Sequence, residues 1–156
     1  MNFIELVSCK IDVESVVELV KTPECGAVSV FLGTTRNNFN GKEVKSLKYE
    51  AYESMAVKVI STICDEIRIK WPNVVNIAIY HRMGEVKILE ASVLIAISSP
   101  HRKESLEAVS YAIDTLKSSV PIWKKEEYCD STGVWKVNKE CSWGESSSKN
   151  AKSSSS

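Results

Sequence analysis

The residues best suited to chemistry in this chain of 156 residues lie in one stretch, 98–126. His101 and Arg102 follow Ser99 and Pro100, a pair that favours the start of a helix. Serine is a good N-cap, and proline costs nothing at the first helical position. We therefore expect His101 and Arg102 in the first turn, beside free backbone N–H groups at the positive end of the helix dipole. This arrangement predicts an anion site.

The predicted helix also positions a second cation. Arg102 and Lys117 project at the borders of its apolar face, at about 100° per residue, and not on the opposite side. Cations are seldom placed beside a buried face, and an anion bound there would explain their position. For any charge taken singly, the alternative is an ordinary solvated side chain. The core-facing residues recur at helical spacing, at Leu106, Val109, Ile113 and Leu116.

A basic cluster follows the predicted helix. The helix ends at Val120, because the next residue is a proline and disfavours a helical residue before it. Lys124, Lys125 and Glu126 come directly afterwards, so we expect them near the same helix end as Lys117. The whole set favours one cationic pocket.

Arg36 is a candidate from a distant part of the chain. Residues 25–33 (CGAVSVFLG) are mostly apolar and rich in β-formers, which predicts a central strand. The loop 33–38 (GTTRNN) places Arg36 among small hydrogen-bonding residues, where several donors can meet an anion. The alternative is an ordinary polar turn, and Asn40-Gly41 just beyond is typical of a hairpin.

Composition limits the functions that remain. The 20 basic residues balance the 20 acidic ones, so bulk charge suggests neither a nucleic-acid partner nor a membrane surface. We see no transmembrane-length apolar run and no signal peptide, which predicts a cytosolic protein. Five cysteines without a CxxC pair, and only two histidines, predict no metal site, disulfide framework or resident cofactor. A persulfide on Cys129, just after the basic cluster, is a weaker alternative.

Strand and helix patterns alternate along the chain. They predict one α+β domain over residues 1–144, with two to three helices packed on a mixed or largely antiparallel sheet. Residues 145–156 are rich in Ser and Lys, and predict a disordered tail because they cannot bury enough apolar surface. Strand patterns cover 3–7, 25–33, 46–52, 74–82, 91–98 and 134–137, and helix patterns follow Asp12, Ser54 and Ser99.

Five ordered motifs make the chain similar to a known family. The motifs are GTTRN at 33–37, YHRMG at 80–84, SPHR at 99–102, LK at 116–117 and PIWKKE at 121–126. With these motifs the chain resembles the large, catalytic subunit of molybdopterin synthase over roughly residues 3–143, and Lys117 and Lys124 keep that family's spacing.

The resemblance implies a reaction and an assembly. Members of this family convert cyclic pyranopterin monophosphate into molybdopterin by installing two sulfurs as a dithiolene, in molybdenum cofactor biosynthesis. Each sulfur arrives as a C-terminal thiocarboxylate on the Gly-Gly tail of a small ubiquitin-like subunit. The assembly is a heterotetramer built on a dimer of the large subunit. The implied fold is an α/β-hammerhead with a small added β-subdomain.

The resemblance also implies roles for seven residues. Lys117 and Lys124 become the catalytic pair and also bind substrate. Their chemistry stays open: they can stabilise negative charge on oxygen, move a proton, or form a covalent acyl-lysine. The remaining expected substrate-binding residues are His101 and Arg102 for the phosphate, Lys125 and Glu126 in the pocket lining, and Arg36 near the incoming tail.

Two other functions remain open at this stage. A non-catalytic module could capture the Gly-Gly tail of a ubiquitin-like protein in the same basic pocket. A phosphate- or nucleotide-binding domain has only the 99–102 helix start in its favour, since the chain has no usual glycine-rich phosphate loop. The sequence ends in four serines and not in Gly-Gly, so the sulfur carrier is expected to be a separate chain.

Overall fold

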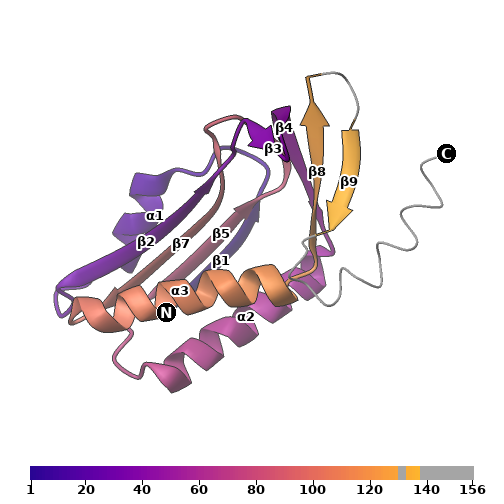
Figure 1. Cartoon of the computed structure of the whole chain (residues 1–156). Helices are drawn as coiled ribbons and strands as arrows, with labels where there is room; N and C mark the ends of the chain where they lie inside the picture. Colours follow the sequence, from indigo (N-terminus) through magenta and orange to yellow (C-terminus); the bar gives the residue numbers. More distant parts are fainter. Residues whose placement is uncertain (130–132, 138–156) are drawn as a thin grey trace.

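Two β-sheets and three helices make up the described part of the chain. The computed structural model describes residues 1–129 and 133–137 (Figure 1). The predicted tail and Cys141 lie outside these residues. The elements are β1 (Asn2–Val7), α1 (Val13–Val20), β2 (Ala27–Thr34), β3 (Asn38–Phe39), β4 (Lys42–Ala51), α2 (Glu53–Lys70), β5 (Ile77–Arg82), β6 (Gly84–Lys87), β7 (Ala91–Ser99), α3 (Arg102–Ser119), β8 (Ile122–Tyr128) and β9 (Gly133–Val137).

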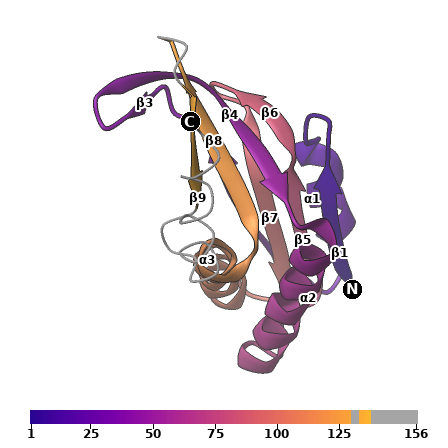
Figure 2. The ribbon, with the colours of Figure 1, turned by 90° about the vertical axis from the view of Figure 1, so that its right-hand side faces the viewer.

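The first sheet has the strand order β1-β5-β7-β2. Strand β1 runs parallel to β5, while β5–β7 and β7–β2 are antiparallel pairs. Helices α2 and α3 cover one face, and α1 covers the other (Figures 1 and 2). The predicted α+β fold, with a mixed sheet packed by helices, is confirmed.

The inner position of β5 and β7 in the first sheet explains why the sequences of these two strands are almost continuously apolar. Both faces of this sheet are covered, so successive residues are buried whichever way they point. Residues 92–99 of β7 are all buried. Strand β2 differs: it is terminal in the sheet, and Val30 and Leu32 are 43% and 39% exposed. The prediction that residues 25–33 form a central strand was wrong, because β2 pairs on one side only.

Helix α2 carries the apolar stripe that its sequence predicts. Five of its residues are buried against the first sheet and α3. The helix starts at Glu53, two residues earlier than expected, and Tyr52 rather than Ser54 is at the N-cap position. It ends at Lys70, with Trp71 at the C-cap position, because Pro72 disfavours a helical residue before it. The buried stripe consists of Ala56, Ile60, Ile63, Cys64 and Ile67.

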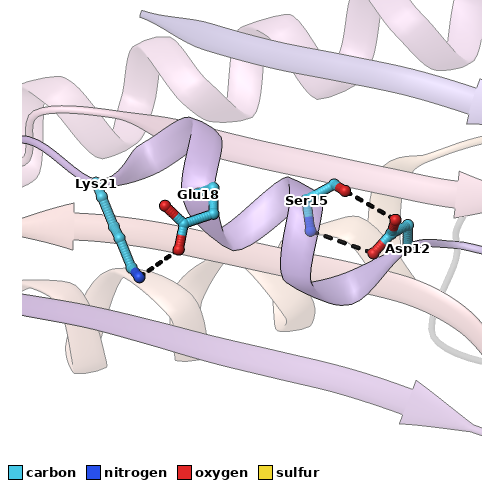
Figure 3. Close-up of polar contacts among 4 residues, drawn as sticks. All are labelled: Asp12, Ser15, Glu18 and Lys21. Carbon is cyan, nitrogen blue, oxygen red and sulfur yellow. Dashed lines mark hydrogen bonds and ion pairs between the residues drawn. The ribbon is translucent and has the colours of Figure 1, made fainter.

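Helix α1 is short and depends on its ends. The carboxylate of Asp12 accepts hydrogen bonds from the Ser15 N–H at 3.2 Å and the Ser15 hydroxyl at 2.8 Å (Figure 3). The bonds from Ser15 lower the pKa of Asp12. Near the other end, Lys21 pairs with Glu18. A helix of eight residues is marginal alone, so this cap stabilises the layer behind the first sheet.

The second sheet is the small β-subdomain that the resemblance implies. Its order is β3-β4-β8-β9, with β6 also paired to β4. The β3–β4 hairpin turns at Asn40 and Gly41, with φ of 50° and 78°, as their sequence predicts. Strand β8 was not predicted: residues 122–126 were interpreted only as the exit from a helix. In the described residues, no helix is both long and apolar enough to cross a membrane.

Candidate functional site

A cleft of about 390 Å³ opens where the two sheets meet the C-terminal end of α3. Its apolar wall includes Phe31 of β2, Val93 of β7 and Leu116 of α3. Gly33 belongs to this wall for a steric reason. A Cβ atom there would lie 2.6 Å from Cγ1 of Val93, closer than real Cβ contacts allow. The cleft therefore needs glycine at the start of the predicted anion loop.

Three cationic side chains converge on this cleft. Arg36 comes from the loop after β2, Lys117 from the last turn of α3, and Lys124 from β8. Arg36 and Lys117 are exposed, and Lys124 is half-buried. The structure thus brings together residues from three elements, as the predicted cationic pocket requires. A cleft with this lining attracts anions by its field alone.

Strand geometry decides which residues of the basic cluster enter the cleft. Successive side chains of a strand point to opposite faces, while directly paired residues share a face. In the β4–β8 pair, Lys124 lies opposite Tyr49, and Lys125 lies opposite Lys48. Glu126 lines the cleft together with Lys124. Lys125 points to the other face and does not line the cleft, contrary to the expectation for it.

Glu126 is the one carboxylate among the residues that line this cleft. Its side chain is only 1% exposed. The Tyr128 hydroxyl donates a hydrogen bond to Oε2 of Glu126 at 2.5 Å. A buried carboxylate beside cations both limits their repulsion and offers an acceptor to a ligand. Glu126 thus lines the cleft, and its role in substrate binding stays a prediction.

His101 and Arg102 lie at the far end of α3. The helix begins at Arg102 with His101 at its N-cap position, so His101 is not in the first turn as predicted. Pro100 keeps Ser99 extended, and Ser99 is instead the last residue of β7. Arg102 and Lys117 are separated by 15 helical residues, or about 22 Å. Neither His101 nor Arg102 lines the cleft of its own chain.

Small residues set how closely α3 packs on the first sheet. Leu106 is 57% exposed, so its predicted place in the core was wrong. Ser105 is fully buried instead, and its hydroxyl lies 2.7 Å from that of Ser29 in β2. The Ser105 N–H also donates to the Ser99 hydroxyl at 3.1 Å. The buried face of α3 consists of Ser105, Ala108, Val109, Ala112 and Leu116.

Neutral polar residues of the cleft were missed from sequence. Tyr49, His81 and Ser92 line it beside the cations. Burial raises the pKa of Tyr49, partly offset by a hydrogen bond with Ser92. Burial also lowers the pKa of His81 to about 4, so this imidazole is neutral at pH 7. The alternation of 46–52 placed Tyr49 on an inner face, but nothing local indicated that this face borders a cleft.

From their types alone, His81 and Arg82 of the YHRMG motif could form a second basic contact, or simply end a strand before the Gly84 turn, and the structure favours the second alternative. His81 is neutral, and Nη1 of Arg82 lies 3.3 Å from a Glu90 carboxylate oxygen. In residues 1–129 and 133–137, no group of three or more His, Cys, Asp or Glu side chains can hold a metal ion. Cys129 is exposed after the end of β8, and it does not line the cleft.

Comparisons with known proteins agree with this geometry. Residues 6–119 match the MoaE protein family. A molybdopterin synthase catalytic subunit from Taeniopygia guttata is 61% identical over 145 residues, covering 93% of this chain and 93% of that protein. Molybdopterin synthase catalytic subunit 1 from Aedes aegypti is 56% identical over 148 residues, covering 94% and 96%.

A solved structure has the same fold. Molybdopterin synthase from Staphylococcus aureus aligns with a TM-score of 0.80 at 43% sequence identity, over 85% of this chain and 95% of that one. The family match spans well over half of the chain, and the relatives cover nearly all of it. The chain therefore belongs to the MoaE protein family.

Proposed function

We propose that this chain is the catalytic subunit of a molybdopterin synthase. It transfers sulfur from the C-terminal thiocarboxylate of a small ubiquitin-like subunit to cyclic pyranopterin monophosphate. The product carries the dithiolene of molybdopterin. One observation carries the proposal: Arg36, Lys117 and Lys124 reach a single cleft from three separate elements, in a chain of the MoaE family.

The cleft suits a reaction between two anions. The thiocarboxylate and the substrate phosphate repel each other in water, and a cationic cleft lowers the free energy of bringing them together. Each transfer exchanges one sulfur for one oxygen. The C–S bond of the thiocarboxylate breaks, a C–S bond to the substrate forms, and the small subunit leaves as an ordinary carboxylate with oxygen from substrate or water.

The two lysines act where charge develops. The thioacyl group can be attacked by a nucleophile, or its sulfur can itself attack the substrate. In both cases negative charge develops on oxygen, and a fixed ammonium group nearby stabilises that charge. Lys124 is held by the β8 ladder, and Lys117 by the last turn of α3. A residue on a regular element is held more precisely than one on a loop. Either lysine can also transfer the proton that accompanies C–S bond cleavage.

The distance along α3 changes how the phosphate site must be built. His101 and Arg102 lie about 22 Å from Lys117 along one helix, a separation that one small substrate does not span. The expected dimer supplies a second copy of α3. We therefore assign His101 and Arg102 to phosphate binding across the dimer. Each site then combines the lysines of one copy with the start of α3 from the other copy. The cytosolic location stays a prediction.

A reconstitution experiment tests the proposed function. The purified chain is mixed anaerobically with the thiocarboxylated small subunit and cyclic pyranopterin monophosphate, and dithiolene product is measured. We expect product with the thiocarboxylated partner and none with its carboxylate form. Binding of both partner forms without any product would instead support the non-catalytic tail-binding module.

A further inference from the structure

His81 occupies the end of β5 that borders the cleft. Ile77, Ile79 and His81 alternate along β5 and share one face. The two isoleucines belong to the core between the first sheet and helices α2 and α3, whereas His81 lines the cleft. The His81 side chain is 5% exposed. A histidine thus replaces a core residue at the point where the core meets the cleft.

The protonation of this ring follows from one hydrogen bond. Nδ1 of His81 lies 2.9 Å from the carbonyl oxygen of Arg82. A carbonyl can only accept, so Nδ1 must carry the proton, and Nε2 of the neutral ring keeps its lone pair. Burial favours this neutral form by lowering the pKa of His81 to about 4. The imidazole is therefore held in one tautomer.

Nε2 faces the cleft without a protein partner. Among the residues that the structure describes, no hydrogen bond reaches this atom. Fully buried side-chain atoms without a partner occur in the described residues on Thr22, Arg82 and Glu104. Nε2 of His81 is absent from this set because it keeps contact with solvent in the cleft. The Tyr49 ring packs edge-on against the imidazole, with centroids 4.9 Å apart and planes at 68°. Tyr49 thus fixes the ring plane from the second sheet.

The polar groups that line the cleft differ in whether they donate or accept hydrogen bonds. The side chains of Thr34, Asn38, Tyr49 and Ser92 can do both. Arg36, Lys117 and Lys124 suit the anionic parts of the reactants. They cannot accept a hydrogen bond from an N–H group. The lining groups that only accept are the Glu126 carboxylate and Nε2 of His81, and Glu126 already accepts from Tyr128. A reduced pterin presents several ring and amino N–H donors, which need acceptors when they leave water.

We propose that His81 is a substrate-binding residue whose Nε2 accepts a hydrogen bond from an N–H donor of the pterin ring. This inference rests on the proposed function. The site then has a cationic part for the anionic groups of the reactants, completed by His101 and Arg102 of the second copy, and a neutral acceptor for the heterocycle. Such an acceptor orients the ring and discriminates against heterocycles that lack the donor.

Two conservative variants separate this role from a structural one. His81→Gln places an amide near the position of Nε2, so it can keep an acceptor toward the cleft. His81→Asn reaches only the position of Nδ1, so it can keep the contact with the Arg82 carbonyl but lacks the distal acceptor. The two replacements differ by one methylene and carry the same amide group. Each is measured for thermal unfolding and for affinity to the thiocarboxylated small subunit.

The decisive measurement is steady-state turnover with cyclic pyranopterin monophosphate in the reconstituted complex. We expect His81→Asn to raise the KM for this substrate about tenfold, the value of one hydrogen bond, with partner affinity unchanged. His81→Gln should restore the KM to within about threefold of wild type. A wild-type KM in His81→Asn, or equal losses in both variants that follow their unfolding temperatures, would overturn the inference. Wild-type protein that forms no product would instead refute the proposed function itself.

Discussion

Lys124 and Tyr49 are cross-strand partners in the β4–β8 pair, and both point into the cleft. The position of Lys124 is therefore set by the register of a ladder and not by a loop. Lys125 is the next residue, yet it pairs with Lys48 on the opposite face. A shift of one residue in this register would exchange the two lysines.

The two cleft lysines should be needed for sulfur transfer. Lys117→Ala and Lys124→Ala should each lower kcat at least about 100-fold, because each removes a cation that stabilises charge developing on oxygen. The measurement is dithiolene formation in the reconstituted complex. Lys48→Ala is the matched control, since this exposed lysine lies on the other face of β4. Full activity in both cleft variants would refute their catalytic role.

Complementation tests whether α3 acts across a dimer. Arg102→Ala and Lys117→Ala proteins should each be nearly inactive. After mixing and exchange of subunits, half of the dimers are mixed and each contains one intact site, so about a quarter of wild-type activity should return. The check is turnover before and after exchange. No recovery, in a sample where mass spectrometry shows mixed dimers, would place Arg102 outside the site.

His81 should make stability depend on pH. Its pKa falls from 6.5 to about 4 on folding because the ring is buried. Between these values the unfolded chain binds a proton that the folded chain does not, so the free energy of unfolding falls as pH drops from 6.5 toward 4. The loss attributable to His81 is roughly 3 kcal/mol at most. Urea unfolding of wild type and His81→Gln at pH 7.5 and 4.5 isolates the contribution of His81. The carboxylates titrate in both proteins, so their contribution cancels in the comparison.

In that comparison, the wild type should lose more stability than His81→Gln as the pH falls. Parallel curves for the two proteins would show that His81 keeps an ordinary pKa. Tyr49 packs on the His81 ring and contributes to its burial, which lowers the pKa. Introducing Tyr49→Ala into both proteins should therefore reduce the difference between their two curves.

Leu89 is strained, and glycine should relieve it. Its φ is 71°, in the turn between β6 and β7, and its side chain is 83% exposed. A residue with a Cβ costs about 1–2 kcal/mol in this conformation, whereas little apolar burial is lost by removing the side chain. Leu89→Gly should therefore raise the free energy of unfolding by about 0.5–1 kcal/mol, after the entropy cost of glycine. Leu89→Ala, which keeps the Cβ, should show no such gain in denaturant unfolding.

Local patterns predicted most elements but not their order in the sheets. The Asn40-Gly41 turn and the apolar stripe of α2 are encoded within a few residues, so they were predictable. The terminal place of β2 depends on β7 pairing with it on one side only, and no short segment specifies that. Strand β8 was missed because its KKEE run lacks an apolar alternation, and its pairing with β4 compensates.

The candidate site was predictable in composition and not in geometry. Arg36, Lys117 and Lys124 were identified as cations near an anion, and they do share one cleft. His101 is far from that cleft because the whole length of α3 lies between them. The prediction considered which face of the helix each residue occupies, and not the distance between them along the helix. From the sequence, His81 was considered only as part of a motif and of a possible basic segment at a strand end. Its neutral state arises from burial between two sheets, which is a property of the tertiary fold.

The parallel pairing of β1 with β5 has a consequence during synthesis. The first strand of the chain lies beside residues 77–82, and its N-terminal amino group bonds to the Asn76 side chain at 3.0 Å. On the ribosome, Phe3, Ile4 and Leu6 emerge long before their partner strand exists, and β5 in turn needs β7. During synthesis, β1 must therefore remain an unpaired strand until β5 and β7 have also emerged from the ribosome. An exposed apolar strand of this kind is prone to aggregate and is a target for chaperones.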